Sequence, residues 1–185
     1  KQIASRRPED AEISFEEHRM LIQNLEGDCV LHLLNHQMHW LCELASHLST
    51  EQIDKVHRPY VWTVRQVVEH CCDVERFFGM CLLRFSAGDV DPIPGFDHNA
   101  YANSRFGLGN FSGLITELGY LRQANLQLLR RIVPAAWDRE GVMDGHQMTT
   151  RALAWLAAGH LDHHLGIIES RCGLKIQRSL DMSSS

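Results

Sequence analysis

The stretch of sequence that decides the fold is TTRALAWLAAGHLDHHLGIIESRCG, residues 149–173. Its apolar residues recur at steps of three and four, which is the spacing of one face of an α-helix. At 100° per residue, the residues within about 40° of one direction are Thr149, Leu153, Leu156, His160, His164 and Ile167. Gly173 stands where a helix C-cap is expected. We therefore predict a helix from about Thr149 to Arg171 whose core-facing stripe contains two histidines.

Before this helix, the chain carries three more amphipathic patterns. The first covers residues 15–48, and Gly27 and Asp28 are candidates to interrupt it. Ser14 and Glu17 have the spacing of a capping box at its start. Its apolar stripe is Leu31, Leu34, Met38, Leu41, Ala45 and Leu48. The pattern predicts a helix whose opposite face meets water.

The second and third patterns are separated by a long polar segment. The second begins at Thr63, which has capping-box spacing to Gln66, and fades at residues 86–88. Its stripe is Val67, His70, Val74, Phe77, Phe78 and Cys81. The third runs over residues 112–132 and ends before Pro134. Its stripe is Leu114, Leu118, Leu121, Asn125, Leu128 and Ile132.

Convincing strand patterns are absent, so four helices predict an all-α four-helix bundle. Residues 89–110, rich in Pro, Gly, Asn and Asp, form a crossover between the second and third helices, and a loop of this length is often functional. The 185 residues suit a single domain. We expect its core at about residues 15–173, with frayed termini at residues 1–12 and in the Ser tail 183–185.

Composition excludes several classes of protein. Hydrophobic residues at 44% and charged residues at 22% rule out wholesale disorder. A net charge of −5 argues against a nucleic-acid partner. The apolar run 152–158 is too short to span a membrane. The six cysteines include the adjacent pair Cys71 and Cys72 but no CxxC motif, so we expect reduced thiols in a cytoplasmic protein. The chain opens at Lys1 without a signal-like stretch, which leaves a trimmed leader open.

Three histidines lie on stripes that must face the core: His70 on the second helix, and His160 and His164 on the fourth. A buried imidazole without partners costs about 1–3 kcal/mol. A divalent metal would satisfy all three rings, and three protein ligands leave a position open, as in catalytic zinc sites. A lone core histidine is more often structural, and an HxxxH pair alone is weak evidence. Their combination favours a metal site, with Zn, Ni or Fe as the ion.

The remaining histidines do not extend this pattern. His163 lies about 60° from His160, near the edge of the stripe. The set His32, His36 and His39 has ligand-like spacing but lies on the face predicted to meet water, so we interpret it as a solvated face. Adventitious metal binding or a subunit contact in a homodimer is the alternative. His18, His47 and His57 belong to no constellation.

Several segments together resemble the DinB-like (damage-inducible) superfamily. The likeness runs from about residue 61 to residue 171, and the order and spacing of its segments carry it. These segments are residues 62–66, 70–75, 94–97 with Tyr101, 137–141, 148–149 and 159–165. One departure is Leu161, which separates His160 from Asp162 where members often have Asp directly after the histidine.

The resemblance implies an up-down-down-up bundle with a divalent metal held by His70, His160 and His164. Characterised members include metal-dependent transferases that use low-molecular-weight thiols such as bacillithiol or mycothiol, an isomerase, and proteins named as hydrolases. We therefore expect a metal-dependent enzyme that transfers a small thiol to a small-molecule electrophile. A metal-dependent hydrolase and a non-enzymatic, dimeric metal-binding module are the alternatives.

Candidate residues around the metal follow from the sequence. Asp73, one turn after His70, is the candidate catalytic residue, with a surface salt bridge as its alternative. His98 and Tyr101 on the long loop are candidate cofactor or substrate contacts. Asn125, the one polar residue on the third stripe, is a candidate to reach the pocket, with a buried hydrogen-bond bridge as its alternative. Glu75 points about 140° from His70, so we expect a structural ion pair there.

Overall fold

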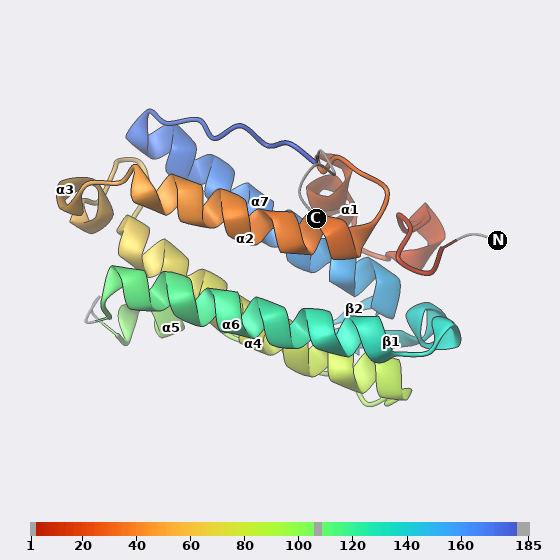
Figure 1. Ribbon diagram of the computed structural model, residues 1–185. Coiled ribbons are helices and arrows are strands. Elements are labelled where there is room, and N and C mark those ends of the chain that lie inside the picture. Colours follow the sequence, from red (N-terminus) through yellow and green to blue (C-terminus); the bar gives the residue numbers. More distant parts are fainter. Residues whose placement is uncertain (1–2, 106–108, 181–185) are drawn as a thin grey trace.

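The computed structural model describes residues 3–105 and 109–180. Its four long helices are α2 (Val30–Ser46), α4 (Val64–Ala87), α6 (Phe111–Arg131) and α7 (Thr150–Cys172). In Figure 1, α2 and α7 run in one direction and α4 and α6 in the other. The predicted all-α bundle with up-down-down-up order is therefore confirmed.

Shorter elements precede the first long helix or connect the long helices. They are η1 (Asp10–Glu12), α1 (Glu16–Gln23), α3 (Thr50–Asp54), α5 (His98–Asn103), η2 (Pro134–Asp138), β1 (Glu140–Met143) and β2 (His146–Thr149). The expected break after the first helical turns is thus wider than Gly27 and Asp28, since no helix covers residues 24–29. Helix α1 packs on α7, where a side chain at Gly159 would meet the carbonyl oxygen of Leu21 at 2.9 Å.

Capping side chains fix where the two site-bearing helices begin. Thr63 accepts a hydrogen bond from Gln66 N at 3.1 Å, and Gln66 Oε1 accepts one from Thr63 N at 2.9 Å. Thr149 caps α7, and Gly173 ends it with a φ of 64°. The capping box expected at Ser14 is wrong: its Oγ accepts from Gln147 N at 2.9 Å, across the fold.

The expectation of no strands is also wrong, because β1 and β2 form a small antiparallel hairpin with Glu140 opposite Thr149. Its turn uses Asp144 at φ 51° and Gly145 at φ 78°. At Gly141, a Cβ would lie 2.2 Å from the Phe85 ring, so the hairpin packs flat on α4. Strands of four residues are too short for alternation to mark them in the sequence.

The crossover between α4 and α6 is tied down at both ends of its described part. Ile93 donates its N–H to the Val142 carbonyl at 2.9 Å and accepts from Asp144 N at 2.9 Å. Further along, α5 packs on α4. The predicted loop therefore contains a helix, and its residues 106–108 lie outside the described part of the chain.

The buried faces of α2 and α6 differ from the predicted stripes by about one residue. Gln37 and Arg122 are both 0% exposed, whereas Met38 and Leu121 are only partly buried. The stripe of α4 is as predicted, apart from a partly buried Phe77. The buried apolar cluster fills the space between the four long helices.

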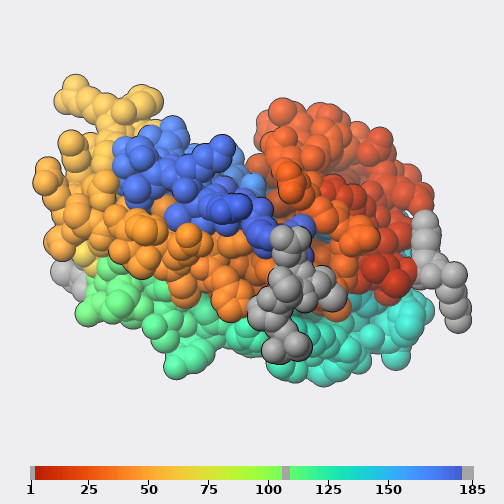
Figure 2. Space-filling view, turned by 45° about the horizontal axis from the view of Figure 1, so that its top comes forward, coloured from red at the N-terminus to blue at the C-terminus, as the bar shows by residue number. Residues whose placement is uncertain are grey.

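The prediction of a frayed segment at residues 1–12 is wrong for the residues that the structure describes there, and the buried core also extends past residue 173. Ser5 and Ile176 are buried, and Arg151 of α7 reaches Glu12 at 2.7 Å. Figure 2 shows the segment after α7, in dark blue, lying alongside α2. The Ser tail 183–185 falls outside the described residues. In the described chain, no helix is both long and apolar enough to cross a membrane.

Candidate metal centre

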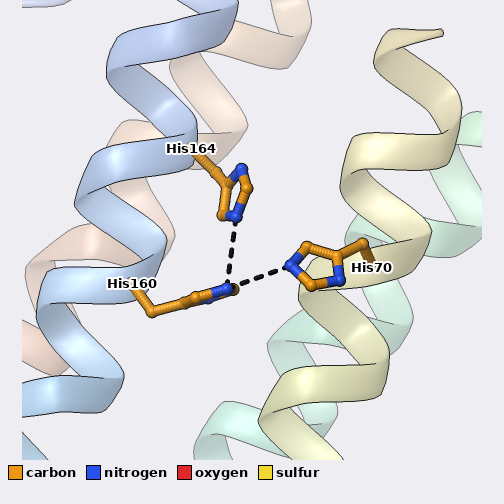
Figure 3. A group of neighbouring side chains, drawn as sticks. All are labelled: His70, His160 and His164. Atoms are coloured by element: carbon orange, nitrogen blue, oxygen red, sulfur yellow. Dashed lines mark hydrogen bonds between the residues drawn. The ribbon is translucent and has the colours of Figure 1, made fainter. Parts of the chain in front are cut away.

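Three imidazoles meet between α4 and α7 (Figure 3). His70 extends from α4, and His160 and His164 extend from successive turns of α7. The Nε2 atom of His160 lies 3.0 Å from Nε2 of His70 and 3.2 Å from Nε2 of His164. One ligand nitrogen from each ring lies within 4.8 Å of the others. The structure therefore brings together the three histidines that the sequence selected.

Burial keeps these rings neutral at pH 7. It lowers the pKa of His70 to about 4, with a further contribution from the nearby charge of His98. It lowers the pKa of His164 to about 3, and the pKa of His160 falls well below its ordinary value. Neutral imidazole is the form that donates a lone pair to a metal.

Hydrogen bonding alone satisfies this cluster poorly. The Nε2 atom of His160 faces two other nitrogens, yet a single ring nitrogen offers either one hydrogen or one lone pair. Nδ1 of His164 is buried without a partner among the described residues. Two nitrogens bound to one tetrahedral ion at 2.0–2.1 Å lie about 3.4 Å apart. This is close to the 3.0 and 3.2 Å that separate Nε2 of His160 from Nε2 of His70 and of His164. The donor set therefore fits a divalent cation.

His70 has a partner for Nδ1, the ring nitrogen that does not face His160. Nδ1 of His70 lies 3.4 Å from Nδ1 of His98, the first residue of α5. The His98 ring in turn stacks on Phe96, with centroids 4.4 Å apart. Such outer contacts set the tautomer and orientation of a ligand histidine. The loop residue His98 therefore lies against the centre, as a contact of His70.

A cavity of about 180 Å³ opens beside His160, toward the β-hairpin. Its walls are mostly apolar and aromatic, with polar groups at a few points. They consist of His18, Leu21, Val74, Phe77, Phe78, Gly95, Phe96, His98, Met143, Asp144, Leu156 and His160. We call it the hairpin-side cavity.

A second cavity, of about 300 Å³, reaches His164. It is lined by Pro59, Tyr60, Val61, Trp62, Val67, Asn99, His164, Ile167 and Arg171. We call it the Arg171 cavity. On α7 its residues follow His160, whereas those of the hairpin-side cavity precede or include it, and on α4 the order is reversed. The two cavities thus flank the three histidines along the bundle axis.

The other predicted site residues are distributed unevenly. The Tyr101 ring lies beside that of Phe96 in the crossover, with centroids 4.6 Å apart and the ring planes tilted by 39°. Asp73 forms a salt bridge with Arg105 at 2.6 Å. The observed contact is therefore the salt bridge that the sequence offered as the alternative to a catalytic role. Neither Tyr101 nor Asp73 lines either of the two cavities.

The structure does not place Asn125 at the histidines. Its Nδ2 atom donates to the carbonyl and to Oε1 of Glu75, at 3.2 and 3.0 Å, in a network that includes Arg122. Asn125 therefore bridges α6 and α4, and the cofactor contact assigned to it is wrong. The expected ion pair of Glu75 is confirmed by Arg122, whose Nε lies 2.7 Å from Oε1.

Sequence reasoning missed several cavity residues. His18 belongs to α1 and Asp144 to the hairpin turn, and neither element was predicted to approach the histidines. Burial and the neighbouring His146 lower the pKa of His18 to about 4, against an opposing effect of Asp144. Arg171 could have been noticed, because it follows His164 by seven residues and so lies on the same face of α7.

Comparisons with known proteins agree with this description. No curated protein matches the chain. The solved structure of YfiT from Bacillus subtilis is similar, with a TM-score of 0.71 and 21% sequence identity over 93% of this chain and 99% of that one. YfiT is described as "a probable metal-dependent hydrolase with an unusual four-helix bundle topology". The sequence model of the DinB superfamily matches residues 39–168. The chain therefore belongs to the DinB superfamily.

Proposed function

We propose that this protein is a metal-dependent enzyme that transfers a low-molecular-weight thiol to a small, mainly apolar electrophile. The observation that supports this proposal is the pair of cavities that flank His70, His160 and His164. Thiol transfer joins two organic molecules at one centre. Hydrolysis needs room for one organic molecule and water. Two separate cavities at one set of ligands suit the first reaction better.

The hairpin-side cavity has the lining that an apolar electrophile requires. Phe77, Phe78 and Leu156 contribute apolar surface next to His160. The neutral His18 ring and the Asp144 side chain form its polar part. Such a site holds an apolar body and orients it through a few polar contacts.

When bound at the three histidines, a divalent cation supplies the positive charge that favours the thiolate form of a thiol, the form that acts as nucleophile. His70, His160 and His164 would hold it through neutral ring nitrogens, and His98 would orient His70. The aromatic ring of Trp62 lies 5.1 Å from that of His70, and the ring of Phe78 lies 5.9 Å from that of His160, so apolar surface borders the group.

The protein's own cysteines on α4 are poor substitutes for an added thiol. Cys71 and Cys72 are buried, and burial raises both pKa values, that of Cys72 to about 12. Neither lines the two cavities. The nucleophilic sulfur would therefore come from a small molecule. All six cysteines are free, which agrees with the cytoplasmic location that we include in this proposal.

Two other functions are distinguished by specific observations. The likeness to YfiT favours metal-dependent hydrolysis as the second candidate. A purely structural metal site, as in a dimeric binding module, is normally closed by a fourth protein ligand. Among the described residues, the group that could hold an ion consists of His70, His160 and His164, which leaves a position open.

The decisive experiment compares two reactions on the same metal-loaded preparation. Conjugation of chlorodinitrobenzene is followed with and without added bacillithiol, mycothiol or glutathione, and hydrolysis of nitrophenyl acetate is followed without thiol. We expect conjugation to require both thiol and metal and to be lost in His160→Ala. The neighbouring exposed His163→Ala serves as the matched control. Hydrolysis that needs no thiol, with no thiol-dependent conjugation, would replace this proposal by the hydrolase.

A further inference from the structure

The Arg171 cavity joins the metal centre to a positive charge. His164, Ile167 and Arg171 are spaced by three and four residues and line it from one face of α7. At 1.5 Å per residue, His164 and Arg171 are about 10 Å apart along the helix. Tyr60 and Trp62 supply aromatic surface between these two ends. The cavity therefore has a cationic end, an apolar middle and a metal-site end.

The guanidinium of Arg171 makes hydrogen bonds only to uncharged groups among the described residues. Its Nη2 donates to the Trp62 carbonyl at 2.6 Å, to Nδ1 of His57 at 3.2 Å and to the Lys55 carbonyl at 3.5 Å. Its Cζ lies 5.0 Å from the centre of the Tyr60 ring. No described carboxylate lies within salt-bridge distance of it. Its Nε is buried without a partner. The charge thus has hydrogen bonds but no counter-ion.

Two other partly buried arginines have the carboxylate counter-ion that Arg171 lacks among the described residues. Arg65 pairs with Asp54 at 2.8 Å, and Arg84 pairs with Asp89 at 2.7 Å. These pairings raise the pKa of both guanidiniums, whereas burial lowers the pKa of Arg171. A partly buried cation without a counter-ion is stabilised when an anion binds.

The surroundings strengthen the positive field. Beyond Arg171 lies a polar cavity of about 430 Å³ that is also lined by Lys55, His57 and Glu51. Burial together with the charges of Arg171 and Lys55 lowers the pKa of His57. Two cations therefore face one acid, Glu51, around this opening. An anionic group of a ligand meets net attraction there.

We infer that the Arg171 cavity binds the thiol co-substrate, and that this molecule carries a carboxylate that pairs with Arg171 while its sulfur lies about 10 Å away beside His164. The identification of the ligand as a thiol rests on the proposed function, whereas the carboxylate rests on Arg171 and the charges around it and does not depend on that function. Guanidinium and carboxylate match in a planar, two-point hydrogen-bonded pair. The assignment leaves the hairpin-side cavity to the electrophile.

Four probes of one chain length separate the two parts of this inference. They are octanoate, octanol, and the same two molecules with a thiol at the far end, mercaptooctanoate and mercaptooctanol. Each is titrated into the metal-loaded protein, with dissociation constants from calorimetry or NMR. We expect each carboxylate to bind about tenfold or more tightly than its alcohol, as for hydrogen bonds to a charged group. A ratio near one in the wild-type protein would overturn the inference.

The variant Arg171→Gln removes the charge and keeps a hydrogen-bond donor. We expect it to bring the carboxylate-to-alcohol ratio close to one, while octanol binds as before and so shows that the cavity persists. Arg171→Lys should retain part of the preference. Arg76→Gln, a surface arginine paired with Glu117, is the matched control and should leave the ratio unchanged. An undiminished ratio in Arg171→Gln would place the carboxylate elsewhere.

The thiol comparison tests the proposed function separately. If mercaptooctanoate binds no more tightly than octanoate, the sulfur makes no contact at the centre and the assignment of this ligand as the thiol fails. The preference for carboxylate over alcohol would still be intact in that case. The two failures are thereby distinguishable.

Discussion

Arg122 of α6 donates from Nε to Oε1 of Glu75 of α4 across 2.7 Å, with both side chains buried in the centre of the bundle. A second hydrogen bond, from Nη2 to Oε2, measures 3.1 Å and makes the ion pair bidentate. Nη1 donates to Oε1 of Gln37 at 2.9 Å, and Gln37 donates to the Ala158 carbonyl at 2.7 Å. One guanidinium thus connects α6 directly to α4 and α2, and through Gln37 to α7.

Replacing Arg122 by Met should destabilise the protein by about 3–5 kcal/mol, because Glu75 is left as a buried charge without its partner. The double variant Arg122→Met with Glu75→Met should lose less than the sum of the two single variants. Urea unfolding of the four proteins gives the coupling energy directly. Strict additivity would mean that the two charges do not interact.

The pair Arg76 and Glu117 is the natural control for this measurement. It joins the same two helices at 2.7 Å, but with side-chain exposures of 57% and 40%. Exposed pairs of this kind contribute about 1 kcal/mol or less. Arg76→Gln should therefore change the free energy of unfolding far less than Arg122→Met.

This buried polar network explains where sequence reasoning failed. An apolar stripe treats Arg122 and Gln37 as surface residues, so the predicted stripes of α6 and α2 fall beside the true ones. Only the three-dimensional pairing with Glu75 shows that a charge is tolerated at the centre. The same pairing accounts for Asn125, a polar residue on a stripe that serves the network rather than the metal centre.

The histidines could be found from the sequence because their pattern is local to two helices. A step of four residues places His160 and His164 on one face of α7. His70 lies on the apolar stripe of α4, and the capping box at Thr63 marks the start of that helix. The approach of His18 and Asp144 depends on how α1 and the hairpin dock against the bundle. No spacing rule encodes such docking, so the cavity walls required the structure.

Metal content tests the ligand assignment. His160→Ala should lower the amount of bound metal well below one ion per chain, because the central nitrogen of the group is removed. His163→Ala, at the exposed residue directly before His164, should keep the full metal content. Elemental analysis by mass spectrometry of the purified proteins checks this. Undiminished metal in His160→Ala, or no stoichiometric transition metal in the wild-type protein, contradicts the assignment.

His98→Ala should weaken metal binding by about tenfold without changing the stoichiometry, since outer contacts of ligand histidines commonly contribute 10–100-fold. The physical reason is the contact of 3.4 Å between Nδ1 of His98 and Nδ1 of His70. Competition with a chelator measures the affinity. His57→Ala, which alters another loop histidine, is the control. Equal affinities of His98→Ala and the wild-type protein would show that His70 needs no such support.

The lowered pKa of Glu12 predicts how the stability of the protein depends on pH. Burial alone would raise its pKa, but hydrogen bonds from the backbone of Glu9 and from Arg151 and Arg6 outweigh this and hold the pKa below the ordinary 4.5. The folded state then releases this proton more readily than the unfolded chain does. The stabilisation is complete above pH 4.5 and is lost as the pH falls through the folded-state pKa.

Glu12→Gln should consequently cost about 1.5–3 kcal/mol at pH 7, the range for hydrogen bonds to charged groups. The difference from the wild-type protein should shrink steadily below pH 4.5, as the native carboxyl becomes protonated and loses its attraction to Arg151. Urea unfolding at a series of pH values measures both quantities. The exposed Glu17→Gln should show little difference at any pH. A wild-type advantage that persisted unchanged into acid would mean that Glu12 acts through packing rather than through its charge.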